Sequence, residues 1–159
     1  MDSLVKLYLE RAENELALAK IIFRLTTEER IQEEIFEVSS PLTFYSAVIS
    51  HAYFAIFYTA KSYLLTKGVK TKPPEEHRKV FEAFKRLVED GVVDVELLQL
   101  YEKVMLRADT LLSILKVEKG KRGKFTYRQL PQANRNPARE SLEHAGVFFK
   151  HLYNLSQKG

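Results

Sequence analysis

The sequence predicts an all-α protein, an antiparallel up-and-down bundle of four to five helices that forms a single domain over residues 1–159. Apolar residues recur at helical spacing along most of the chain, and no stretch alternates with a period of two over enough residues to suggest a sheet. One run, residues 44–68, is apolar nearly all round and contains no proline. A chain of 159 residues is long enough to bury one sizeable core.

The first predicted helix covers about residues 3–25, where apolar residues repeat at three- and four-residue intervals. Thr26 and Glu29 have the spacing of a capping box. Residues 27–37 are therefore predicted as a short second helix or as an extension of the first. A break follows at Pro41.

The central helix is predicted over residues 44–68 and ends in Lys67-Gly68, where a helix would take its C-terminal cap. A helix that is apolar on all sides must be covered on several sides, so we expect it at the centre of the bundle or under a partner subunit. A membrane span is the alternative. His51 and Lys61, which are costly at bilayer depth, favour the buried soluble helix.

Three further segments complete the predicted bundle. A helix over residues 75–89 stops at Gly91, and Asp94 can cap the next helix, which runs to about residue 116. A loop over 116–135 follows. Asn136, which precedes a proline, is predicted to cap the last helix.

The composition favours a cytoplasmic protein without disulfides. The sequence has no cysteine, which fits a reducing compartment. The first residues enter helical periodicity without the basic and apolar segments of a secretory signal.

The basic charge is concentrated in one segment. The net charge is +4, but residues 116–135 carry +6 and the rest of the chain −2. This pattern indicates an anionic partner, nucleic acid first, while a solvated flexible linker is the alternative. The candidate phosphate-binding residues of this loop are Lys119, Lys121, Arg122, Lys124 and Arg128.

We predict no metal and no cofactor. A helical bundle that holds two metals usually supplies Glu-x-x-His pairs, and none of the four histidines has a glutamate three residues before it. The sequence also lacks a glycine-rich phosphate loop and a cysteine nucleophile.

Two groups of polar residues interrupt apolar helix faces. Arg107 lies in an apolar row and needs a carboxylate, water or an anionic ligand there, unless its guanidinium extends into solvent. On the central helix, His51, Tyr58 and Lys61 share a row with Phe54. They are predicted to line a nucleotide-binding site or, alternatively, to be satisfied groups of the core.

Arg139 and His144 form the candidate catalytic pair. An arginine can hold a phosphate, and a histidine near its usual pKa can take the proton of a ribose 2′-hydroxyl, a combination that suits metal-independent RNA cleavage. Their positions on a straight helix differ by about 140°, so a chance coincidence is the alternative.

The central helix closely resembles the second-helix signature of the HEPN domain family. The matching run is Ser50-His-Ala-Tyr-Phe-Ala-Ile-Phe-Tyr-Thr-Ala-Lys-Ser-Tyr-Leu-Leu, close to Ser-Arg-Ala-Tyr-Tyr-Ala-Met-Phe-x-x-Ala followed by Leu-Leu and Lys-Gly. Tyr8-Leu-Glu-Arg-Ala-Glu-Asn-Glu-Leu resembles the family's opening helix, His77-Arg78 its Thr-His-Arg step and Arg107-Ala-Asp109 its Arg-x-x-Ala-Asp-Tyr element. Ala145, Phe148 and Phe149 fit its closing helix, so the resemblance extends in register over about two thirds of the chain.

The resemblance implies a helical bundle that forms a homodimer and is often encoded beside a small nucleotidyltransferase, as a toxin–antitoxin pair. Active members carry an Arg, four to six residues and then a His, and cut RNA without metal when the dimer brings two motifs together. Arg139 and His144 have this spacing, whereas Leu112, Ser113 and Ile114 stand where a histidine would follow Arg107. We therefore expect an RNA- or nucleotide-binding protein, with a non-catalytic dimeric module as the alternative.

Overall fold

The computed structural model describes residues 2–121 and 135–158, with side chains described for residues 2–110 and 135–158. These residues form six helices and no strand, which confirms the all-α prediction. The helices are α1 (Ser3–Thr27), α2 (Glu29–Glu34), α3 (Tyr45–Thr66), α4 (Glu76–Glu89), α5 (Val95–Lys121) and α7 (Arg135–Lys158).

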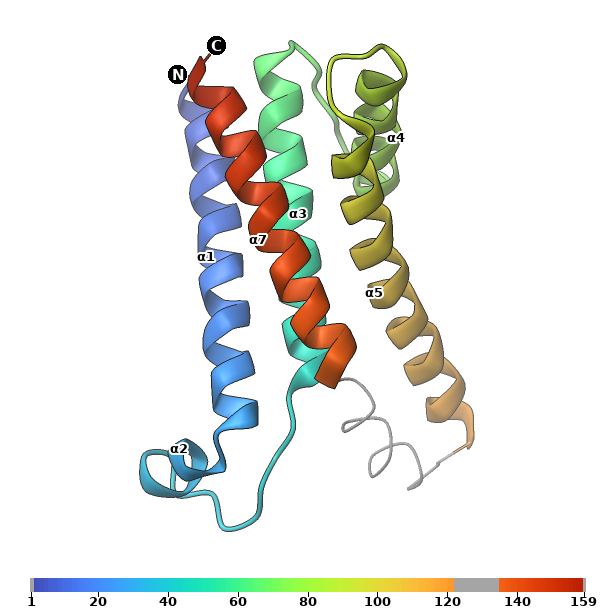
Figure 1. Ribbon diagram of the computed structural model, residues 1–159. Helices are drawn as coiled ribbons and strands as arrows, with labels where there is room; N and C mark the ends of the chain where they lie inside the picture. The colour runs from blue at the N-terminus through green and yellow to red at the C-terminus, as the bar shows by residue number, and fades with distance from the viewer. Residues whose placement is uncertain (1, 122–134, 159) are drawn as a thin grey trace.

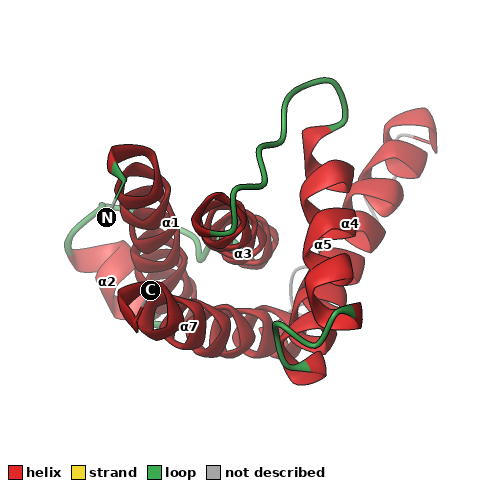
Figure 2. Ribbon diagram, turned by 90° about the horizontal axis from the view of Figure 1, so that it is seen from above, coloured by secondary structure: helices red, strands yellow, loops and turns green. Residues whose placement is uncertain are grey.

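The four long helices α1, α3, α5 and α7 lie side by side and alternate in direction (Figure 1). Helices α1 and α5 run one way, and α3 and α7 run the other. Seen from above, α3 lies between α1 on one side and the α4–α5 pair on the other, while α7 crosses beside all three long neighbours (Figure 2). This order leaves α1 at one edge of the bundle.

Helix α3 is central, as its apolar sequence predicts. It packs against α1, α7, α5 and α4, and of its side chains only Ser46 and Thr66 are exposed. The least covered flank carries His51, Tyr58 and Lys61, all half-buried. None of the described helices combines the length and the sustained hydropathy needed to cross a membrane.

An aromatic cluster joins α4, α5 and α7 in the core. The ring of Tyr101 lies 5.7 Å from Phe148 and 5.7 Å from Phe84, between ring centroids, and Phe84 lies 5.4 Å from Phe148. All three side chains are fully buried, which stabilises the packing of α4, α5 and α7 through both area burial and ring geometry. The Tyr101 hydroxyl has no hydrogen-bond partner among the described residues.

Two glycines end helices as the sequence predicts. Gly68 follows α3 with φ +75° and Gly91 follows α4 with φ +74°. After α3, the Val69 amide donates to the Leu64 carbonyl over 2.9 Å, the bond of a Schellman cap. These left-handed positions favour glycine because it has no Cβ.

The predicted capping box at Thr26 is wrong, although the short helix is real. Helix α2 is preceded by Glu28, whose side chain makes no capping bond. Thr26 belongs to α1, where its hydroxyl accepts a 3.1 Å hydrogen bond from the Phe44 amide. The Thr26 side chain therefore bonds to the segment that leads into α3 instead of capping α2.

The side chain of buried Gln32 holds α2 in place through hydrogen bonds. Its side-chain amide donates to the carbonyl oxygens of Leu25 (3.0 Å) and Leu42 (2.9 Å), and its Oε1 accepts from the Leu42 amide at 2.8 Å. The amide thus joins α1, α2 and the segment that leads to α3.

The boundaries of the last two helices also differ from the prediction. Helix α5 continues to Lys121 instead of ending near residue 116, so the first third of the expected 116–135 loop is helical. Helix α7 starts at Arg135, so Asn136 lies inside the first turn and does not cap the helix from outside. Its Oδ1 accepts a 3.2 Å hydrogen bond from Arg139 instead.

Candidate functional site

The structure brings Arg107 of α5 to one turn of α7. Its guanidinium forms an ion pair with Glu140, and its Nη1 lies 3.5 Å from the Ser141 hydroxyl and 3.4 Å from His144 Nδ1. Arg107 is half-buried, while the Glu140 side chain is 49% exposed. Arg107, which was expected to need a partner, thus contacts a carboxylate, a hydroxyl and a histidine. We call Arg107, Glu140, Ser141 and His144 the α5–α7 site.

The helical repeat explains this convergence. Residues 140, 141 and 144 are three and four positions apart, so they share one face of α7. Ser141 and Ala145 are fully buried on α7, and Val104 and Ala108 are buried on α5. Packing through these small residues brings the long Arg107 side chain to the neighbouring helix.

The surroundings of His144 lower its pKa and so favour the neutral imidazole. Burial lowers its pKa first, and the positive charges of Arg107 and Lys103 lower it further, against an opposing effect of Glu140 and Glu143. A guanidinium only donates, so Nδ1 facing Arg107 carries the lone pair and the proton is on Nε2. A neutral histidine beside an arginine can accept a proton near a bound phosphate.

Arg139 lies outside this group of contacts. It is exposed and donates to Asn136 one turn back on α7. Helix α7 runs without interruption through both residues, so Arg139 and His144 point about 140° apart around it. Of the two arginines singled out from the sequence, Arg107 is the one within reach of His144.

The polar row of α3 finds partners on neighbouring helices. His51 Nδ1 lies 2.5 Å from Glu15 of α1, and Lys61 forms an ion pair with Glu76 of α4. The Lys61 ammonium also lies 4.4 Å from the centre of the Tyr8 ring. These contacts fasten α1 and α4 to α3.

Tyr58 completes the same flank. Its ring stacks on Tyr8 at 6.0 Å, and the Arg11 guanidinium lies 5.6 Å from its centre. Of the nucleotide-binding residues predicted on α3, Tyr58 and Lys61 therefore lie beside Tyr8 of α1, and His51 lies beside Glu15.

His77 and Tyr53 form a contact that the sequence did not indicate as a site. The Tyr53 hydroxyl and His77 Nδ1 are 2.8 Å apart, and the His77 ring stacks on Phe57 at 4.0 Å. Burial lowers the pKa of His77, and burial together with Asp109 raises the pKa of Tyr53 to about 12. Only the family resemblance, through His77-Arg78, pointed to this position.

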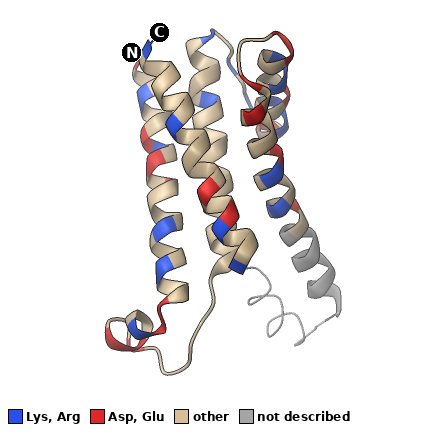
Figure 3. Ribbon diagram, viewed as in Figure 1, with Lys and Arg blue, Asp and Glu red and all other residues tan. Residues whose placement is uncertain are grey.

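The candidate residues of the predicted basic loop lie outside the described side chains. Lys119 and Lys121 belong to α5, but their side chains lie outside the described part, as do residues Arg122, Lys124 and Arg128 entirely. Along the described helices, Lys and Arg residues are interspersed with Asp and Glu (Figure 3). The described residues contain no group of three or more potential metal ligands.

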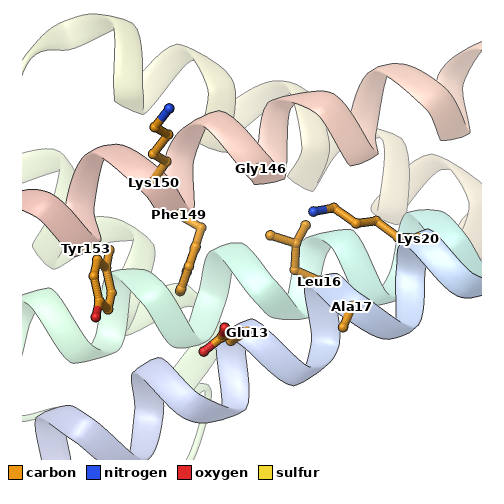
Figure 4. A pocket seen from close by; sticks show the side chains of 8 residues that line it. All are labelled: Glu13, Leu16, Ala17, Lys20, Gly146, Phe149, Lys150 and Tyr153. Atoms are coloured by element: carbon orange, nitrogen blue, oxygen red, sulfur yellow. The ribbon is translucent and has the colours of Figure 1, made fainter.

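An open groove of about 420 Å³ lies between α1 and α7 (Figure 4). Two lysines and a glutamate surround an apolar floor that includes a phenylalanine and a tyrosine. The lining residues are Glu13, Leu16, Ala17, Lys20, Gly146, Phe149, Lys150 and Tyr153.

Comparisons with known family models, curated proteins and solved structures gave no match for this chain.

Proposed function

We propose that this chain is a HEPN-type protein, an up-and-down helical bundle that binds RNA or a nucleotide and cleaves RNA without a metal at the α5–α7 site. The observation that carries the proposal is the contact between Arg107 and a neutral His144. The resemblance of the α3 sequence to the family signature supports it. The resemblance also suggests a homodimer and a toxin-like role beside a nucleotidyltransferase partner.

The proposed chemistry assigns separate tasks to the two side chains. Arg107 turns from His144 to bind a non-bridging oxygen of the phosphodiester, and the Nδ1 lone pair that this frees takes the proton of the adjacent 2′-hydroxyl. The 2′-oxygen then attacks phosphorus as the bond from phosphorus to the 5′-oxygen breaks, and the leaving 5′-oxygen takes a proton from water. The products are a 2′,3′-cyclic phosphate and a 5′-hydroxyl, and His144 returns its proton to solvent. Since Glu140 is half exposed, the phosphate can replace its carboxylate on Arg107.

One observation favours a non-catalytic module as the second candidate. Glu140 already neutralises Arg107, and an ion pair of this kind weakens the attraction for a phosphate. In that case the chain docks a nucleotidyltransferase partner or holds a nucleotide without turning over RNA.

The test is incubation of the purified protein with a single-stranded RNA in EDTA. We expect cyclic-phosphate products from the unsubstituted protein and a loss of at least about 100-fold in His144→Ala, the typical scale for a general base. His151→Ala is the matched control, because His151 is exposed on the same helix and should leave the rate unchanged.

The two arginines are compared in the same assay. Arg107→Ala should abolish cleavage, whereas Arg139→Ala should retain it. Loss only in Arg139→Ala would assign the phosphate contact to Arg139 after all. Absence of cleavage in every sample, with binding of a nucleotide retained, would favour the non-catalytic module.

A further inference from the structure

The open groove between α1 and α7 is a site that the proposed function does not use. Its lining residues extend over two turns of each helix, which is about 10 Å, and none of them belongs to the α5–α7 site. Its volume of about 420 Å³ lies within the range of small-molecule sites. A groove of this length offers far less than the roughly 800 Å² that each side of a stable protein interface buries, so a small ligand fits it better.

The floor of the groove is apolar and largely aromatic. Figure 4 shows the Phe149 and Tyr153 side chains extending from α7 toward α1, and the Leu16 side chain extending from α1 toward α7. The two aromatic rings lie 5.6 Å apart between centroids, and Tyr153 is 40% exposed. An apolar ligand that covers these rings removes apolar surface from water, which favours binding.

Gly146 keeps the groove open at a cost to its own helix. It lies inside α7, and a Cβ at this position would have no atom within 4 Å outside its own helical turn. Glycine in a helix interior lowers stability relative to alanine, because it loses more conformational freedom on folding. The packing of the described chain leaves room for a side chain there and so does not require glycine. A ligand that occupies the groove explains why the position carries no side chain.

The charged residues give the groove a direction. The Lys20 side chain extends along α1 toward Leu16, whereas the Lys150 side chain extends away from α1 (Figure 4). Glu13 precedes Lys20 by seven residues, which places it about 10 Å away along the helix. The Lys20 end of the groove therefore attracts an anion, and the Glu13 end repels one.

We propose that the groove between α1 and α7 binds a small apolar carboxylate of the medium-chain fatty acid class. The carboxylate lies at Lys20, and the apolar chain runs along Leu16 and Phe149. The inference goes beyond the proposed function and does not depend on RNA binding or cleavage. Because one side of the groove is open to solvent, we expect a dissociation constant of about 1 mM or somewhat below.

An NMR titration with octanoate tests the site. We expect saturable shifts of the Gly146 amide and of the Phe149 and Tyr153 ring resonances. His144→Ala should bind octanoate as the unsubstituted protein does, so this result is separate from that of the RNA assay. Groove resonances that do not move at octanoate concentrations well above the expected dissociation constant would overturn the proposal.

The charge contact is tested by pairing a lysine variant with an uncharged ligand. Lys20→Gln should weaken octanoate binding about threefold to fivefold, the scale of an exposed ion pair, and should leave the binding of 1-octanol unchanged. Lys6→Gln is the matched control, because Lys6 is exposed on the same helix outside the groove. Equal octanoate affinities of Lys20→Gln and Lys6→Gln would contradict the placement of the carboxylate.

Gly146→Leu tests the groove without loss of the fold. The added side chain should fill the groove and abolish octanoate binding, while the thermal midpoint in circular dichroism should rise, because leucine favours a helix more than glycine does. Octanoate binding that survives this substitution would overturn the proposal. Self-association that Gly146→Leu abolishes, in a protein that does not bind octanoate, would also overturn it and assign the groove to a second copy of the chain.

Discussion

Arg107 is one of the groups that set the protonation of His144, after burial of the imidazole. The guanidinium lies 3.4 Å from His144 Nδ1, and its charge is one of the causes that lower the pKa of the imidazole. Glu140, which pairs with Arg107, acts in the opposite direction on the same pKa. The protonation of one histidine therefore reports on the geometry of the whole site.

Substitutions at these two partners should move the pKa of His144 in opposite directions. Arg107→Ala removes a cause of the lowering, so the pKa of His144 should rise, and Glu140→Gln should lower it further. An NMR titration of the His144 Cε1 proton measures both changes, with His151 as the internal reference. A His144 resonance that titrates identically in all three proteins would exclude the contact in solution.

The sequence identified both members of this pair without pairing them. Arg107 stood out as a charge in an apolar row, and His144 stood out through its spacing from Arg139. The two lie on different helices, and their contact depends on the register in which α5 and α7 pack. Residue spacing within one helix carries no information about that register.

Helix ends were predictable where the signal is local. Gly68 and Gly91 end α3 and α4 because their positive φ angles are local backbone requirements. The capping box at Thr26 failed because a residue distant in sequence, Phe44, uses the threonine hydroxyl. Tertiary contacts overruled the local pattern there.

Alanine at two glycines should change stability with opposite signs. Gly68→Ala places a Cβ at φ +75° and should lower the free energy of unfolding by about 1 kcal/mol. Gly146→Ala lies inside α7 with no atom within 4 Å of the new Cβ, and should raise it by about 0.5–1 kcal/mol. Urea unfolding measures both, and a gain at Gly68 would contradict the cap geometry.

Gln32 should be the most sensitive polar residue of the α1–α3 connection. Gln32→Ala removes the partners of the part-buried backbone groups of Leu25 and Leu42, and we expect a loss of about 1–2 kcal/mol in the free energy of unfolding. Gln99→Ala, at an exposed position of α5, is the control and should change the free energy of unfolding by no more than about 0.5 kcal/mol. Equal effects would show that α2 is not held by this amide.

At the scale of the whole molecule, the bundle depends on α3, which nearly every other element covers. The all-round apolar sequence of α3 predicted that position, and the structure confirms it. The exposure of Leu4, Leu7, Leu18 and Ile21 on α1 was not predicted from the sequence, because apolar residues occur on both the buried and the exposed face of that helix. Only the burial of each residue separates them.

Acid should destabilise the bundle through two histidines. The pKa values of His77 and His144 are both lowered in the folded chain, so the unfolded chain binds protons more readily. Their contribution to stability is complete above about pH 6.5 and is lost as the pH falls through the lower folded values. Urea unfolding at pH 7.5 and 5.5 measures the loss.

A double variant isolates this contribution. His77→Asn with His144→Asn should show a smaller loss of stability between the two pH values than the unsubstituted chain. A loss of the same size in both proteins would mean that other groups cause it.

The central claim is that RNA binds where Arg107 meets His144, and an NMR titration with a short single-stranded RNA in EDTA tests it most directly. We expect the Arg107 Nε–H and His144 ring resonances to shift together, the pKa of His144 to change as phosphate replaces Glu140, and the affinity to fall as salt is added. Saturable RNA binding that leaves both resonances unmoved would contradict it.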